Sequence, residues 1–234
     1  MPTTSAATAP PLRIDFVSDV ACPWCAVGLG ALEEALRRTA GQIDVSVHFQ
    51  PFELNPAMAP EGQDVTEHLA QKYGSTPAQQ AAARQGLLAR GAAVGFAFNP
   101  EGRGRVWNTF DAHRLLHWAE VSGSGRQHAL KQALLAAYHG RSEPVADRAV
   151  LARIAGEAGL DAAQAREILD SDTYADAVRE REQHWLAAGI RAVPSVVIDG
   201  RYLVQGGQPP EAFEQALRQA AAAATAPAEA EPAA

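Results

Sequence analysis

Cysteine is scarce in this chain. Its 234 residues include two, Cys22 and Cys25, separated by Pro23 and Trp24. Secreted proteins of this size usually carry several disulfides, whereas these cysteines could form a single bridge over a very short loop. No stretch approaches the roughly 20 continuous apolar residues of a membrane span. Residues 1–11 lack the charged start and the apolar run of a secretory signal. We therefore expect a cytoplasmic protein without a membrane partner.

Positive charge is also in short supply. Lys and Arg together number 20 against 27 Asp and Glu, which gives a formal net charge of −7 at pH 7. This balance argues against nucleic acid or an anionic membrane as the main partner. Apolar residues make up 47% of the chain, enough for a sizeable core. The length fits one large domain or a smaller domain that carries an insertion.

The first part of the chain has the pattern of a parallel strand pair. Residues 12–17 predict a short buried strand, which runs into the cysteine motif and then an amphipathic helix. Apolar and polar residues alternate over 43–50, the period of a half-buried strand. Strand, helix and strand in so few residues predict a right-handed crossover between parallel strands.

The last part of the chain predicts a hairpin and a helix. Strands are expected at 195–198 and 201–204, on either side of Asp199-Gly200, which is a strong hairpin signal. Pro209 and Pro210 then start a helix that is expected to end near Ala220.

Between these ends the periodicity is helical. The expected helices are one capped by Asn108 and running through Trp118, one over 130–139, one opened by Asp147, one opened by Asp161, and one that stops at Gly189. The sequence therefore predicts an α/β protein of the order β-α-β then β-β-α, with a large all-α insertion between the halves. We assign residues 12–54 and 189–222 to the core and 55–188 to the insertion, with disordered ends at 1–11 and 223–234.

The cysteine pair has three possible roles: a structural staple, half of a metal site, or a redox couple. A disulfide over so short a loop stabilises a fold by only about 2 kcal/mol. A zinc site needs two more ligands, and there is no second cysteine pair. His113 and His117 are spaced i, i+4 but lack the adjacent Glu of a metalloprotease helix, so we expect no metal.

The redox role has a physical mechanism. Cys22 stands where a strand ends and a helix begins, and Pro23 suits the first helical position because it has no N–H to leave unpaired. The helix N-terminus stabilises a thiolate on Cys22, which lowers its pKa and makes it the nucleophile. Cys25, one turn later, can attack a mixed disulfide at Cys22 and release the substrate. A Cys-x-x-Cys beside a βαβ pattern is typical of a thioredoxin-like redox pair.

Two glycine patterns have simpler explanations than a nucleotide site. Gly28 and Gly30 could begin a dinucleotide fingerprint, but Glu33 occupies the place of the third glycine. Close packing of the helix explains them better. The segment Gly102-Arg-Gly-Arg105 follows no strand and is expected to be a solvated loop.

Four stretches of the chain match the motifs of one known family: Ser18-Asp-Val-Ala-Cys-Pro-Trp-Cys25, Pro51-Phe-Glu-Leu-Asn-Pro56, Asn108-Thr-Phe-Asp-Ala-His-Arg-Leu115 and Val193-Pro-Ser-Val-Val-Ile-Asp-Gly-Arg-Tyr202, which runs on to Gly206-Gly-Gln-Pro-Pro210. In these stretches the chain resembles the DsbA-like thioredoxin-fold proteins, and among them the FrnE-type cytosolic dithiol-disulfide isomerases and oxidoreductases. The resemblance implies a thioredoxin fold with a helical insertion. It also implies a cis Val193–Pro194 peptide bond placed against Cys22, and a Val193 backbone that pairs with a substrate chain.

The resemblance implies a thiol-disulfide oxidoreductase or isomerase that acts on proteins or small thiols. Its redox centre is the Cys22–Cys25 disulfide itself, with no bound cofactor and with glutathione as a candidate co-substrate. Trp24 stands where DsbA has histidine, and either Asp15 or Asp19 could be the base for Cys25. Phe52–Pro56 and the Asn108–Trp118 helix are expected to border the groove above Cys22. The alternative is that Phe110, Leu115 and Trp118 only fill the core of the insertion.

Alternatives remain open at this level. The kappa-type glutathione transferase and hydroxychromene carboxylate isomerase branch shares the fold, but it typically has serine at the first motif position. A non-catalytic chaperone would tolerate the loss of both cysteines. The sequence leaves open whether the protein is a monomer or a homodimer.

Overall fold

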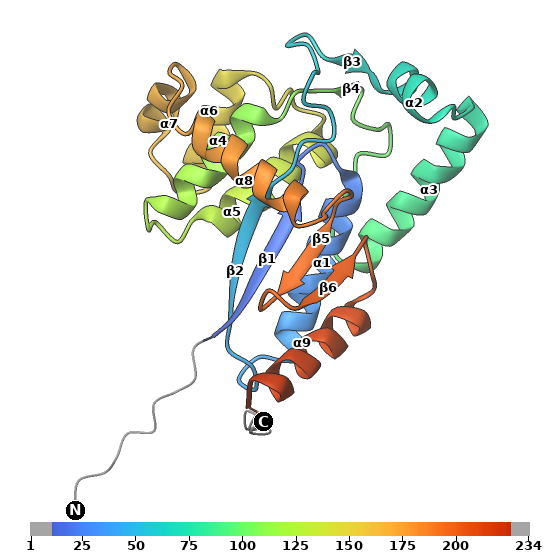
Figure 1. Cartoon of the computed structure of the whole chain (residues 1–234). Coiled ribbons are helices and arrows are strands. Elements are labelled where there is room, and N and C mark those ends of the chain that lie inside the picture. The colour runs from blue at the N-terminus through green and yellow to red at the C-terminus, as the bar shows by residue number, and fades with distance from the viewer. Residues whose placement is uncertain (1–10, 226–234) are drawn as a thin grey trace, which may run out of the picture.

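The computed structural model describes residues 11–225 and centres on a four-stranded mixed sheet (Figure 1). The strands are β1 (Leu12–Ser18), β2 (Val45–Pro51), β5 (Ser195–Ile198) and β6 (Tyr202–Gln205), in the order β2-β1-β5-β6. β1 is parallel to β2 and antiparallel to β5, and β5 is antiparallel to β6. The predicted parallel pair and C-terminal hairpin are therefore both confirmed.

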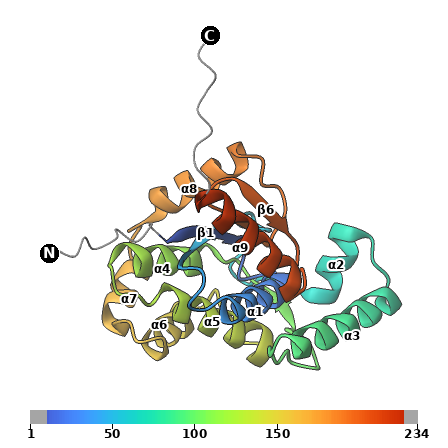
Figure 2. The same cartoon turned by 90° about the horizontal axis from the view of Figure 1, so that it is seen from below.

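Both faces of this sheet are covered, which explains the nearly continuous burial of β1. Ile14 and Phe16 pack in one core with α1 (Pro23–Arg38) and α9 (Pro210–Thr225). Val17, which points to the opposite face, packs with Trp185 of α8 (Ala175–Ala187). Figure 2 shows α1 and α9 side by side on their face of the sheet.

The turn between β5 and β6 follows its sequence signal. Asp199 and Gly200 have φ angles of +53° and +67°. Two successive left-handed residues match a type I′ turn, whose twist suits a tight hairpin.

The segment between β2 and β5 is mostly helical, as expected, with one difference. Its helices are α2 (Val65–Tyr73), α3 (Pro77–Ala93), α4 (Phe110–Val121), α5 (Gln127–Leu135), the π-helical turn η1 (Ala136–Gly140), α6 (Arg148–Glu157), α7 (Ala162–Leu169) and α8. The difference is a small antiparallel sheet of β3 (Gln63–Asp64) and β4 (Arg105–Val106), so the segment is not entirely α-helical. Two residues per strand leave no periodic pattern for a sequence to display.

Two helix starts follow their capping signals, and two helices have other bounds than expected. Asp147 and Asp161 are N-caps whose carboxylates accept bonds from the first backbone N–H groups of α6 and α7. The expected 130–139 helix begins at Gln127 and changes to π-helical hydrogen bonding at Ala136. α9 continues to Thr225, beyond the position 223 where we placed the start of the tail. The rest of that tail, and residues 1–10, lie outside the described residues.

The inserted segment has its own core and also shares the core of the sheet. Leu115, Trp118, Leu130, Leu134 and Tyr138 belong to a cluster of buried side chains from α4 to α7. Leu135 instead packs with the cysteines and the sheet. The division of the chain at 54 and 189 stays a prediction, because the two cores meet at α5. Within residues 11–225 no helix is both long and apolar enough to cross a bilayer.

Candidate active site

Cys22 occupies the junction that the sequence predicted for it. β1 ends at Ser18, and Pro23 is the first residue of α1, so Cys22 is the N-cap, with an extended backbone at φ −88° and ψ 113°. Cys22 is 5% exposed and Cys25 is fully buried one turn below. Both are free thiols. The outer thiol therefore faces the site and the inner one is screened from solvent.

The two thiols have opposite electrostatic surroundings. A hydrogen bond with the Cys25 thiol, and the N–H groups of Cys25 and Trp24, lower the pKa of Cys22, although burial and the Asp19 charge oppose this. Burial and the neighbouring Cys22 raise the pKa of Cys25 well above its ordinary value, with Lys131 acting in the other direction. Cys22 is consequently the thiol that ionises first, and Cys25 is the one that needs help to lose its proton.

The loop before β5 closes the other side of Cys22. The Val193–Pro194 peptide bond is cis, as the resemblance implied. The Cys22 thiol donates to the Val193 carbonyl oxygen over 3.5 Å, which is within reach for sulfur. Pro194 packs closely against α1 at Gly28, where the missing side chain leaves room for the proline ring.

Gly28 is a testable part of this arrangement. A Cβ at Gly28 would lie 2.9 Å from Pro194 Cγ, whereas a Cβ at Gly86, in α3, would meet nothing within 4 Å. We expect Gly28→Ala to lower the free energy of unfolding by about 1–3 kcal/mol through overpacking. Gly86→Ala, the matched control, should raise it by roughly 0.5–1 kcal/mol because alanine is the better helix former. Urea denaturation measures both, and equal stability of the two variants would contradict the tight contact.

Asp19 is the best-connected polar group beneath the cysteines. Its Oδ1 accepts from Ala21 N at 2.9 Å and Thr109 Oγ1 at 2.7 Å, and its Oδ2 accepts from Leu54 N at 2.7 Å. His113 Nε2 lies 3.5 Å from Oδ1. Burial works to raise the pKa of Asp19, but His113 and the two backbone N–H groups outweigh it and hold the pKa below its ordinary value. Asp19 is thus a stable anion that organises three loops around the site.

Asp15, the other candidate base, is committed elsewhere. Its carboxylate pairs with Arg13 at 2.7 Å and accepts from Gln50 Nε2 at 2.7 Å. No hydrogen bond or ion pair described for it involves either cysteine.

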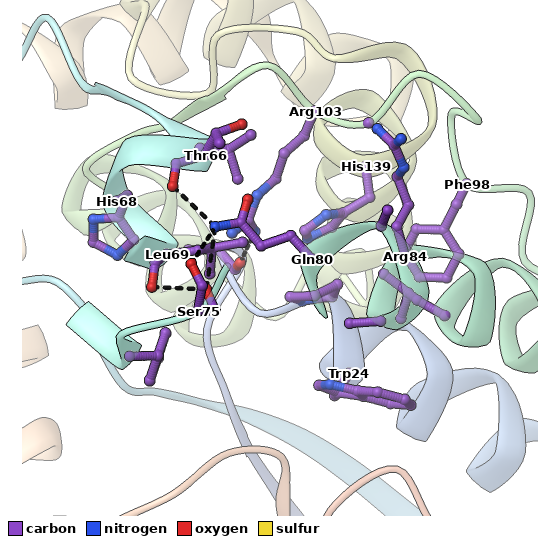
Figure 3. A pocket seen from close by; sticks show the side chains of 18 of the residues that line it. Trp24, Thr66, His68, Leu69, Ser75, Gln80, Arg84, Phe98, Arg103 and His139 are labelled. Atoms are coloured by element: carbon purple, nitrogen blue, oxygen red, sulfur yellow. Dashed lines mark hydrogen bonds between the residues drawn. The ribbon is translucent and has the colours of Figure 1, made fainter. Parts of the chain in front are cut away.

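A cavity of about 760 Å³ opens in front of Cys22. Its walls come from the N-terminus of α1, from Leu54 and Asn55, from α2 and α3, and from the loop that leads to β4. Figure 3 shows Trp24 on one side of this space, and Arg103 and His139 on another. Trp24 is 40% exposed, and the Arg90 guanidinium lies 5.9 Å from its ring centroid. The site is therefore a walled pocket that Cys22 helps to line.

The α2–α3 hairpin forms the outer wall of this pocket. It projects from the body of the molecule (Figures 1 and 2), and α2 contributes no fully buried residue. Gln80 Nε2 ties its two helices together through Thr66 O at 3.1 Å and Ser75 O at 3.2 Å (Figure 3). Thr76 caps α3 with a reciprocal capping box to Gln79. Few apolar contacts hold this wall, so it belongs to the less stable parts of the fold.

This arrangement corrects our prediction for the groove. Leu54 and Asn55 do border it, but the 108–118 helix does not. Leu115 and Trp118 fill the core of the insertion, and the Phe110 ring stacks under Arg179 at 3.8 Å. The apolar spacing of α4 is that of a helix packed on other helices, which sequence periodicity does not distinguish from a helix that lines a groove.

Arg103 also departs from expectation, because its loop is not simply solvated. Its guanidinium donates to the Ala21 carbonyl and lies 5.4 Å from the Tyr138 ring centroid. Arg84 joins it in the cavity wall, so two guanidinium groups border the pocket. His139 Nε2 is 2.8 Å from Val20 O, and burial together with the Arg103 charge lowers the pKa of His139 to about 3. The positive charge of the pocket therefore comes from arginine, while His139 stays neutral.

Three side chains at the site could not be predicted from the sequence, namely Lys131, Arg103 and His139. Nothing local distinguishes them from surface residues, since each reaches the site through the tertiary fold. Within residues 11–225, no group of three or more His, Cys, Asp or Glu side chains could hold a metal ion. The expectation of a metal-free site stays a prediction.

Comparisons with known proteins agree with this geometry. Residues 13–218 match the model of the DSBA-like thioredoxin domain. The "uncharacterized protein YwbO" of Bacillus subtilis (strain 168) is 29% identical over 207 residues, covering 88% of this chain and 96% of that protein. The "probable DsbA oxidoreductase SCO1869" of Streptomyces coelicolor superposes with a TM-score of 0.83 at 37% identity, covering 95% of this chain and 93% of the other.

Two more distant structures share the fold. A 2-hydroxychromene-2-carboxylate isomerase has a TM-score of 0.62 at 12% identity, over 88% of this chain and 95% of its own. The cytosolic disulfide reductase DsbM of Pseudomonas aeruginosa, solved with GSH, has a TM-score of 0.59 at 18% identity, over 88% and 98%. The match of the family model over most of the chain, with a cysteine pair at the start of α1, shows that this chain belongs to the family of the DSBA-like thioredoxin domain.

Proposed function

We propose that this protein exchanges thiols and disulfides through Cys22 and Cys25. The Cys22 thiolate attacks one sulfur of a substrate disulfide, and the other sulfur leaves as a thiolate. Cys25, once deprotonated, attacks Cys22 Sγ in the mixed disulfide, so that the Cys22–Cys25 disulfide forms and the second substrate sulfur leaves. The observation that carries the proposal is the pair itself, with an outer thiol of lowered pKa in a pocket and an inner thiol of raised pKa beneath it.

The pocket favours a small thiol or disulfide with a carboxylate, and glutathione is the co-substrate we propose. Apolar side chains from α2 and α3 and the two arginines Arg84 and Arg103 border the cavity. The solved complex of DsbM with GSH, on the same fold, is compatible with this choice. The Val193 carbonyl beside the Cys22 thiol would pair with the backbone of a peptide substrate. Isomerisation of protein disulfides, a FrnE-type assignment and a cytoplasmic location belong to this proposal.

The isomerase branch is the second candidate, because one of its members shares the fold. A glutathione-dependent isomerase needs no inner thiol. Cys25, buried directly below Cys22, therefore favours disulfide exchange.

Trapping tests the proposed function. In Cys25→Ser the second step is blocked, so we expect most of the protein to accumulate as a mixed disulfide at Cys22 after incubation with oxidised glutathione or an unfolded disulfide protein. Intact mass and peptide mapping identify the adduct and its position. Cys22→Ser, the matched control, should capture nothing. Absence of any adduct on Cys25→Ser with both substrates would contradict the proposal, and an adduct with glutathione alone would restrict the substrates to small thiols.

A further inference from the structure

The interior below the active site holds a lysine without a partner. Lys131 of α5 is fully buried. Its Nζ has no hydrogen-bond partner among the described residues. An ammonium group in a protein interior is costly unless it is paired, so a lysine kept in such a place calls for a reason.

The face of α5 that carries Lys131 points at the sheet. Gln127, one turn earlier, accepts from Phe49 N at 3.0 Å and donates to Phe49 O at 3.0 Å, which fixes α5 against β2. Leu135, one turn later, packs in the core that contains Cys22 and Cys25. Because residues four apart share a helix face, Lys131 lies between the anchor on β2 and the core of the cysteine pair.

In the next turn, which belongs to η1, a side chain on this same side contacts the loop before the cysteines. His139 in η1 lies 2.8 Å from Val20 O, two residues before Cys22. α5 and η1 therefore run under the end of β1 and the start of α1, and Lys131 is the one member of this row with an amine.

The ionisable groups around Lys131 are those of the active site. Burial lowers the pKa of Lys131, while Cys25, Asp19 and Cys22 act, in that order, to raise it. His139, from η1, is a further titratable neighbour, and burial keeps its imidazole neutral near pH 7. Asp19 is a poor competitor for a proton, since its carboxylate already accepts from three donors.

We propose that the Lys131 amine is the internal proton acceptor for the Cys25 thiol in the resolving step. The neutral amine takes the proton, which leaves a Cys25 thiolate and a Lys131 ammonium. The thiolate attacks Cys22 Sγ, the new S–S bond forms, and the substrate sulfur leaves with the electron pair. The ammonium then loses its proton to the departing thiolate or to solvent. No oxidant beyond the mixed disulfide is needed.

Burial and the cysteine pair act on the pKa of Lys131 in opposite directions, as this role requires. Burial favours the neutral amine, which can accept a proton, and the nearby sulfur favours the ammonium once the thiolate forms. It also explains how Cys25, whose pKa is well above its ordinary value, can react. The proposal rests on the proposed function, because it concerns the second step of that exchange.

A reaction with two optical phases tests the proposal. Reduced protein mixed with equimolar dithiobis(nitrobenzoic acid) releases one coloured aryl thiolate when Cys22 attacks and a second when Cys25 attacks the mixed disulfide. In Lys131→Met we expect the first phase to change less than about twofold and the second to slow about 10²-fold near neutral pH, the effect of losing a general base. The deficit should shrink as the pH rises, because hydroxide then increasingly replaces the amine as the proton acceptor for Cys25. Gln132→Met, an exposed neighbour on the same helix, should leave both phases unchanged.

Thermal unfolding separates this role from a structural one. Removing an unpaired buried amine should leave the Tm of Lys131→Met unchanged or higher. A second phase that keeps the wild-type rate and pH profile in Lys131→Met would overturn the proposal, as would an equal slowing of both phases with a lower Tm. A wild-type protein that releases only one aryl thiolate would instead contradict the resolving role of Cys25 and thus the proposed function.

Discussion

Cys22→Ser should abolish thiol–disulfide exchange, with a fall of at least about 10⁴-fold in the rate of insulin reduction. A serine oxygen cannot form a disulfide, and its hydroxyl is not ionised at neutral pH, so neither the attack nor the mixed disulfide survives. The surroundings that lower the pKa of Cys22, namely the Cys25 thiol and the N–H groups of Cys25 and Trp24, then have no thiolate to stabilise. Turbidity of precipitating insulin chains, with glutathione as the reductant, measures the rate.

The same substitution one turn deeper is the matched control. Cys25→Ser should keep the first attack and lose only the release of the substrate. The two variants therefore differ in which step fails, although each replaces one sulfur by one oxygen at a buried position. If Cys22→Ser kept a tenth or more of the wild-type rate, the nucleophile would have to be sought elsewhere.

The parts of the fold with local signals could be predicted from the sequence. Asp147 and Asp161 begin helices because a carboxylate in front of a helix satisfies its first N–H groups. Asp199-Gly200 predicts a hairpin because both residues tolerate positive φ. The alternation over β2 and the position of Pro23 placed the cysteine pair at the start of α1. These features depend on neighbours along the chain.

The walls of the pocket could not be predicted, because they depend on contacts between distant segments. β3 pairs with β4 through Gln63 and Val106, which are far apart in the sequence. Strands of two residues are too short to show an alternation of apolar and polar side chains. Arg103 donates a hydrogen bond to the carbonyl of Ala21, which lies 82 positions earlier in the sequence. Arg103 stands between two glycines, a pattern typical of a solvated loop. Charged and polar side chains in helices are usually exposed, so Lys131 gave no sign of its burial.

The α2–α3 hairpin shows the same limit for apolar residues. Its leucines, including Leu87 and Leu88, are only half-buried and line the cavity. A helix with apolar residues on one face predicts a partner, but the pattern does not tell whether the partner is a core or a ligand pocket.

Asp19→Ala should be the most destabilising single substitution at this site. The change leaves the N–H groups of Ala21 and Leu54 and the Thr109 hydroxyl without their acceptor in the interior. Each such loss costs about 1–3 kcal/mol, and breaking a buried charged network costs about 3–5 kcal/mol in total. We expect a loss of that size in the free energy of unfolding by urea. We also expect the segment that leads from Asp19 to Cys22 to lose its fixed conformation.

Asp19→Asn removes the negative charge but nearly keeps the shape of the side chain. It keeps one carbonyl oxygen but places an amide N–H₂ toward a donor, so we expect a loss of roughly 1–3 kcal/mol. Asp15→Asn, at the other buried carboxylate of this region, should cost less, because its partner Arg13 is half exposed and its pairing is partly screened.

The pH dependence gives the sharpest check on Asp19. Its pKa in the folded protein lies below its ordinary value, so the carboxylate adds stability above an unfolded-state pKa of about 3.9. That contribution is lost as the pH falls through the lower folded-state pKa, because the folded carboxylate must then take up a proton. The stability gap between wild type and Asp19→Asn should therefore be constant from about pH 7 to 5 and narrow below about pH 4.

Because the Asp19 charge acts to raise the pKa of Cys22, Asp19→Asn should also be alkylated faster at Cys22 in mild acid. A gap that widened in acid, or an unchanged alkylation profile, would mean that Asp19 is not the buried anion that organises this site.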